Sequence, residues 1–372
     1  MPTKYPASFN ARQLFADWLS HGLIDQEHHA RLEQFVTNRD HGTELPLYLR
    51  ALVGVGALIA LLCFIGFLTV AGLVNFESEP GLAFWGLVFI AGAVLLDVAS
   101  GGDDNTVRDS FFMQASFCFM ATGKILLVAA IALLFKPNVE WGIAVGALLV
   151  TAATYFVYRM SIDRFLSSLA VLVSIFVNLL LTRTFDIGTQ TLLLNAFFVA
   201  QLGMAALLMT HGKIRQAFIP IAYALIASLC IEVLFFSMQS QIGYWGYSYN
   251  FSPVITNISL TVALIALIGW AAGDMGKLKS EALAVAVLGA LCLGAISAPG
   301  ILLAVGLMTL GHVKHDRLLL VSGGLLIPVF LFLYYYNLDL TLMAKSGTLV
   351  ASGAVLLAGR AYVHFRHFDR EI

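Results

Sequence analysis

Residues 49–74 read LRALVGVGALIALLCFIGFLTVAGLV, an apolar run whose one charge, Arg50, lies at its start. An α-helix needs about 20 consecutive apolar residues to cross the hydrocarbon core of a bilayer. In that environment a helix satisfies its backbone hydrogen-bonding groups internally. The run therefore predicts a membrane-spanning helix.

Similar apolar segments recur along the chain after this one. Of its 372 residues, 59% are hydrophobic and only 12% are charged, against about 25% charged in soluble domains. The apolar segments are 49–74, 82–99, 111–135, 141–158, 165–182, 191–210, 217–238, 254–273, 282–297, 300–312, 318–336 and 341–359. We predict an all-α, polytopic membrane protein with about 12 transmembrane helices.

The stretch 282–312 is longer than one span requires, and Ser297-Ala-Pro-Gly300 interrupts it. Proline breaks a helix interior and disfavours helix in the residue before it. We therefore expect two short spans joined by a tight turn.

The distribution of lysines and arginines supports an even number of spans. With alternate loops assigned to one side, 17 of the 21 lysines and arginines fall on the side of the N-terminus, as the positive-inside rule requires of a cytoplasmic side. They are Lys4, Arg12, Arg31, Arg39, Arg50, Arg108, Arg159, Arg164, Lys213, Arg215, Lys277, Lys279, Lys314, Arg317, Arg360, Arg366 and Arg370. Both termini are therefore predicted to be cytoplasmic.

Three regions follow from this topology. Residues 1–45 predict a cytoplasmic helical hairpin and linker, with Asn10 and Asp25 placed to cap two short helices. Residues 46–360 form the transmembrane bundle, and 361–372 a basic cytoplasmic tail. The net charge of −1 and the acidic surplus in the hairpin argue against nucleic acid as a partner, which leaves the bilayer and a protein.

A small group of charges lies within or at the mouth of predicted spans: Glu232, Lys124, Lys345 and Asp339. Charges in lipid are costly, so they normally face protein and have a partner. One interpretation is an ion or proton site. The other is a static buried pair between Glu232 and one lysine, with Asp339 capping the last helix.

Two further groups are weaker candidates. The uncharged loop 239–253 carries Tyr244, Trp245, Tyr247 and Tyr249, which fit either an interfacial aromatic belt or a surface for a headgroup or partner. The i, i+3 histidine pairs could share a metal if helical, although interface-seeking side chains explain them more simply, and we expect no metal and no cofactor. These pairs are His312 with His315 and His364 with His367.

The last third of the chain resembles a bacterial multi-pass membrane family, domain of unknown function 4401. The resemblance rests on Ala298-Pro-Gly-Ile-Leu-Leu-Ala304, on Tyr334-Tyr-Tyr-Asn-Leu-Asp-Leu-Thr-Leu-Met-Ala-Lys-Ser-Gly347 and on Ala351-Ser-Gly353. The segment Trp18-Leu-Ser-His-Gly-Leu-Ile-Asp25 is similar to the hairpin of a related family of unknown function. The resemblance implies a location in the inner membrane of a bacterium and an exported partner protein, and it supplies no activity.

Two functions remain open, a scaffold or sensor as the first reading and a transporter or channel as the alternative. The hairpin, the aromatic loop and the resemblance favour a scaffold or sensor that works with a partner. The number of spans and the charges Glu232, Lys124 and Lys345 favour a transporter or channel. No P-loop, nucleophile elbow, dinucleotide fingerprint or His-Glu-x-x-His helix is present in the sequence, so an enzyme is the less favoured class.

Overall fold

The computed structural model describes the helical core of the chain and parts of both ends. The described residues are 18–21, 25–29, 31, 47–72, 78–99, 107–181, 186–210, 218–238, 253–275, 280–296 and 298–337, with positions 343, 346, 347 and 350. Within them are eleven long helices and no strand. Their bounds lie within four residues of the first eleven predicted segments, so the helical class is confirmed.

The chain divides into two compact units. Unit 1 comprises residues 1–146 and 152–160, and unit 2 comprises 147–151 and 161–372. The helices of unit 1 are α3 (Leu47–Val70), α4 (Glu79–Ala99), α5 (Val107–Leu134) and most of α6 (Val139–Tyr155).

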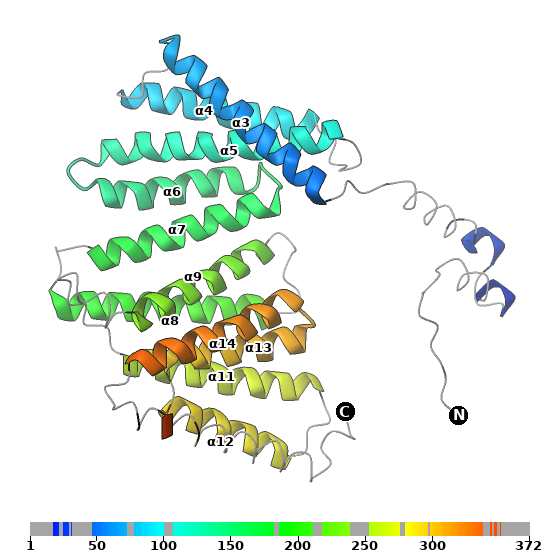
Figure 1. The fold of residues 1–372 in the computed structure, drawn as a ribbon, viewed down its shortest axis with the longest axis vertical. Coiled ribbons are helices and arrows are strands. Elements are labelled where there is room, and N and C mark those ends of the chain that lie inside the picture. Colours follow the sequence, from blue (N-terminus) through cyan, green and yellow to red (C-terminus); the bar gives the residue numbers. More distant parts are fainter. Residues whose placement is uncertain are drawn as a thin grey trace. The chain divides into compact units, whose positions relative to one another are not determined.

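In unit 1, α4 and α5 form an antiparallel pair, and Figure 1 shows α3 crossing them. The pair is close because glycines face each other, so that a Cβ atom on Gly123 would lie 2.8 Å from the backbone oxygen of Gly86. Further along, the hydroxyl of Ser116 donates to the Ala93 carbonyl at 2.8 Å and lies 2.9 Å from the hydroxyl of buried Tyr158. Small residues and internal hydrogen bonds are typical of helix contacts in membranes.

Unit 2 is built around α9 (Ile219–Ser237), whose second residue is Pro220, since the first turn of a helix favours proline. It contacts α7 (Ser161–Leu181), α8 (Ile187–Thr210), α13 (Pro299–Lys314) and α14 (Arg317–Asn337). The remaining helices are α11 (Pro253–Met275) and α12 (Ser280–Ile296). Leu229, Val233, Phe198 and Phe330 are among the fully buried side chains of this core.

The break predicted within 282–312 is present. Helix α12 ends at Ile296, and α13 begins at Pro299 after an extended Ala298. Proline is pre-organised for the first turn of a helix, so it starts α13 and cannot continue α12. Whether each of these short helices crosses the bilayer stays a prediction.

Six helices in the described part of the chain are long and apolar enough to cross a membrane. They lie at 79–99, 109–134, 161–181, 187–210, 219–237 and 254–273, and the other five long helices contain shorter apolar windows. The count of about 12 spans is therefore not confirmed. The twelfth predicted segment, 341–359, falls almost wholly outside the described residues.

Large apolar side chains lie on the outer faces of both units. Phe67, Leu95 and Ile125 in unit 1, and Leu192 and Val262 in unit 2, are each more than 60% exposed. A soluble protein rarely exposes apolar side chains this densely, whereas lipid solvates them without cost.

Candidate functional site

The most unusual buried side chain in unit 2 is a carboxyl group, Glu232 on α9, which is 1% exposed. The hydroxyl of Ser228, one turn earlier on the same helix, donates to its Oε1 atom at 3.0 Å. The Nε2 atom of Gln201 on α8 donates to the same oxygen in a short hydrogen bond. We call these three residues the Glu232 site.

The position of the site within unit 2 explains its burial. Half of the apolar window of α9 is buried inside the protein, against 22–28% for the other candidate spans. Ser228, Gln201 and Glu232 are all at most 3% exposed. Glu232 also lies five residues before the end of α9, about 7.5 Å along the helix axis.

Both donors at the Glu232 site are neutral. An ionised carboxylate removed from water costs several kcal/mol unless a cation offsets that cost, and two neutral hydrogen bonds offset it only in part. A carboxyl group in this setting is suited to taking up and releasing a proton.

The site also contains an acceptor that is not satisfied. The Oε1 atom of Gln201 is buried and has no hydrogen-bond partner among the described residues. A protonated Glu232 could donate to that oxygen after a rotation of the Gln201 amide, since either end of an amide can face a neighbour. The pair can thus satisfy both protonation states of the carboxyl group.

The remaining buried amides differ from Gln201. The side-chain nitrogens of Asn178 and Asn195 each donate at 2.7 Å to the carbonyl four residues earlier on their own helix. Gln201 instead makes the interhelical hydrogen bond expected of polar side chains in a bundle.

The predicted charge group is only partly within the described residues. Lys124 is buried on α5, at 9% exposed, and belongs to unit 1, whereas Glu232 belongs to unit 2. Lys345 and Asp339 lie outside the described residues. An ion pair between Glu232 and one of these lysines therefore stays a prediction, and the partners seen for Glu232 are Gln201 and Ser228.

The other candidates are mostly outside the described residues as well, namely Tyr244, Trp245, Tyr247, Tyr249, His364 and His367. His312 is exposed in the last turn of α13, and His315 follows the helix end with a φ of 53°. The helical i, i+3 geometry assumed for this pair is therefore absent. Among the described side chains, no three His, Cys, Asp or Glu residues form a group that could hold a metal ion.

A second polar contact was not predicted from the sequence. The hydroxyl of Tyr223 on α9 donates to Asp316, which lies in the turn between α13 and α14. The other carboxylate oxygen of Asp316 accepts from the backbone N–H of Leu318 at 2.9 Å and so caps α14. Asp316 thus joins α9 to the α13–α14 hairpin.

Long apolar helices with apolar side chains on their outer faces define a membrane-embedded helical protein. Within that class, the chain belongs to the family described as domain of unknown function (DUF4401), whose family model matches residues 46–364. The match covers the whole helical core and leaves the N-terminal region 1–45 outside it. No curated protein and no solved structure matches the chain.

Proposed function

We propose that the protein is a proton-coupled transporter or channel of the bacterial inner membrane, and that Glu232 is the residue that binds the proton. The observation that carries this proposal is one carboxyl group buried between helices α8 and α9, whose two hydrogen-bond donors among the described residues are both neutral. Ionisable residues inside membrane segments commonly mark ion pathways and proton relays.

A proton suits the site better than a metal ion. Divalent cations in proteins are held by several carboxylates or imidazoles, and among the described residues Glu232 is a single carboxylate with two neutral neighbours. A proton needs one basic oxygen and a nearby acceptor, which Glu232 and Gln201 supply.

The proposal includes the full predicted topology: about 12 spans, with both termini cytoplasmic. It is supported by the positions of 17 of the 21 basic residues on one side of the predicted bundle. It is also supported by the agreement between the described helices and the predicted segments.

The test is proton flux into vesicles that contain the purified full-length protein and a trapped pH-sensitive dye, driven by a potassium diffusion potential. The native protein should carry protons faster than empty vesicles, and Glu232→Gln should reduce the flux to the empty-vesicle level. Glu79→Gln is the matched control, because Glu79 is a partly exposed carboxylate that pairs with Lys136 at 3.7 Å. Flux that is equal in the native and Glu232→Gln proteins would refute the assignment.

A scaffold or sensor that works with a partner protein is the second candidate. It is supported by the N-terminal region, which lies outside the family match and carries a short exposed helix. Asp25 caps that helix through the backbone N–H of His28 at 2.7 Å, and Arg31 pairs with Glu27 at 2.7 Å. A small exposed helical module beside a membrane bundle is suited to docking.

Purification from native membranes distinguishes the two functions. A scaffold should retain one partner protein in a fixed ratio, and a chain that begins at Leu45 should lose that partner while still inserting. The loop 239–253, including Tyr244 and Trp245, stays a proposed surface for a partner or headgroup on the other side.

A further inference from the structure

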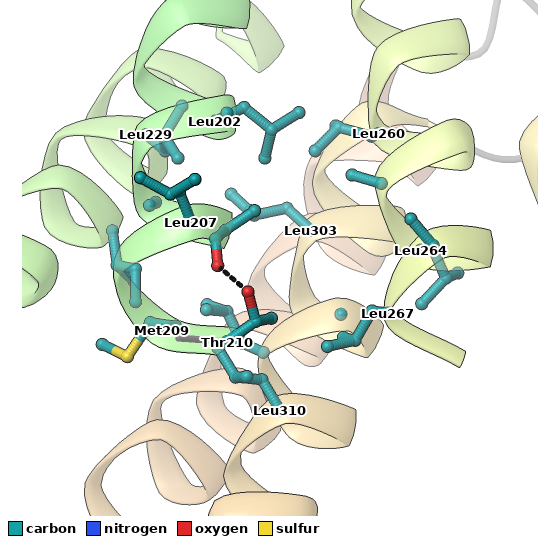
Figure 2. Close-up of a pocket in the computed structure, with 18 of the residues that line it drawn as sticks. Leu202, Leu207, Met209, Thr210, Leu229, Leu260, Leu264, Leu267, Leu303 and Leu310 are labelled. Atoms are coloured by element: carbon teal, nitrogen blue, oxygen red, sulfur yellow. Dashed lines mark hydrogen bonds between the residues drawn. The ribbon is translucent and has the colours of Figure 1, made fainter. Parts of the chain in front are cut away.

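Unit 2 contains a cavity of about 420 Å³ between helices α8, α9, α11 and α13. Its wall consists almost entirely of aliphatic side chains, and Figure 2 shows Leu207, Leu264, Leu303 and Leu310 around it. The hydroxyl of Thr210, one of its few polar groups, donates to the carbonyl of Ala206 on its own helix at 2.7 Å. The wall therefore offers little for a polar ligand to bind.

The cavity extends to the outer face of unit 2. Leu207 lines it and is 60% exposed, and Ala206, Gly203 and Ala266 on the same wall are also exposed. Because the outer face of this protein is solvated by lipid, an apolar opening there is accessible to acyl chains.

The length of the cavity fits one leaflet. Its wall follows α8 from Leu202 to Thr210, α11 from Leu260 to Trp270 and α13 from Leu302 to Leu310. At about 1.5 Å per residue these stretches are about 12–15 Å long, which is half of the ~30 Å hydrocarbon thickness.

The positively charged side chain of a lysine lies at one end of the cavity. Trp270 lines the cavity near the C-terminal end of α11, and the Nζ atom of Lys314 lies 5.2 Å from the centre of its ring. Lys314 is the last residue of α13 and is exposed, as are the neighbouring His315 and Arg317. Amphipathic tryptophan and lysine side chains of this kind lie at the level of lipid headgroups.

We propose that this cavity binds one acyl chain of an anionic phospholipid, with the headgroup phosphate beside Lys314. The apolar wall holds the chain, and the basic end selects the charge of the headgroup. This site is separate from the Glu232 site and does not depend on the proposed transport function.

The chain offers variants that fill the cavity without disturbing its wall. A Cβ atom added at Gly306 or Gly203 would meet no atom within 4 Å, and both glycines line the cavity. Gly289 on α12 is equally open and lies elsewhere, so Gly289→Leu is the matched control for Gly306→Leu.

The experiment incubates the purified full-length protein in mild detergent with equal amounts of phosphatidylglycerol and phosphatidylcholine. Retained lipid is then measured by mass spectrometry after washing. The native protein and Gly289→Leu should retain phosphatidylglycerol in preference, and Gly306→Leu should lose it. Lys314→Gln should keep a bound phospholipid but reduce the preference about fivefold, as expected for one lysine facing an anionic lipid.

Two results would overturn the proposal. One is equal retention of the two phospholipids by the native protein. The other is undiminished retention of phosphatidylglycerol by Gly306→Leu. If Gly306→Leu does not fold, Gly203→Leu fills the same cavity from α8 and must give the same loss.

Discussion

At the scale of single residues, the Glu232 site has one partner that the sequence indicates and one that only the structure reveals. A carboxyl group in an apolar segment is visible in the sequence, and Ser228 lies one helical turn before it, at i−4. Gln201 is 31 positions away, and its contact with Glu232 depends on the rotation of α8 against α9. No periodicity within either segment determines that rotation, so this partner required the structure.

Two substitutions at Glu232 should differ in their effect on stability. Glu232→Gln keeps an acceptor oxygen for Ser228 and Gln201, whereas Glu232→Leu leaves both buried donors unsatisfied. Each unsatisfied donor costs about 1–3 kcal/mol. We expect a clearly lower thermal midpoint for Glu232→Leu than for Glu232→Gln in detergent. Equal midpoints would show that these hydrogen bonds contribute nothing.

Asp186, just before α8, should make the start of that helix sensitive to acid. The hydroxyl and the backbone N–H of Thr189 both donate to its carboxylate and hold the pKa of Asp186 below its usual value of 3.8. The stabilisation is complete above the unfolded pKa and is lost as the pH falls through the lower folded pKa.

Hydrogen exchange at residues 187–190, corrected for intrinsic rates, should therefore rise as the pH falls below the usual pKa of 3.8. Asp186→Asn is the control, because asparagine also caps helices and does not titrate. The acid-dependent step should be absent in that variant. Its persistence there would assign the step to another group.

At the scale of elements, the α13–α14 hairpin shows how a proline determines where a helix starts and how a glycine lets two helices pack closely. Pro299 starts α13, and the break in the helix at this point was predicted because proline acts through local sterics. The close contact at Gly323 was not predicted, because it depends on which face of α14 meets α13. A Cβ atom there would lie 2.8 Å from the backbone oxygen of Ala304.

Adjacent glycines in α14 provide a matched pair. Gly323→Ala should destabilise the protein by about 1–3 kcal/mol, because backbone on α13 must move. Gly324→Ala meets no atom within 4 Å and should be neutral or stabilise by up to about 1 kcal/mol. The thermal unfolding midpoints of the two variants, measured in the same detergent, give the order of their stabilities directly. A lower midpoint for Gly324→Ala than for Gly323→Ala would contradict the packing of this pair.

At the scale of the whole molecule, hydropathy was sufficient to locate the helices but not to count the spans. Each predicted segment that the structure describes contains a helix, because apolar length alone predicts one. Six of these helices meet the requirements of a span, and α12 and α13 are only 17 and 16 residues long. The division into two units at α6 has no counterpart in the hydropathy.

Reporter fusions test the predicted topology. An alkaline phosphatase fused at Ile372 should be inactive, because the basic tail is predicted to be cytoplasmic, and one inserted within 239–253 should be active. With the N-terminus cytoplasmic, an active fusion at Ile372 would require an odd number of spans.

The central claim is that the carboxyl group of Glu232 exchanges a proton within the membrane. Infrared difference spectroscopy of the full-length protein in lipid, recorded while the pH is stepped, observes that group directly. We predict a protonated-carboxyl band that changes with pH in the native protein and in Glu79→Gln, and that is missing in Glu232→Gln. A spectrum of Glu232→Gln that matches the native one across the pH range would contradict the claim.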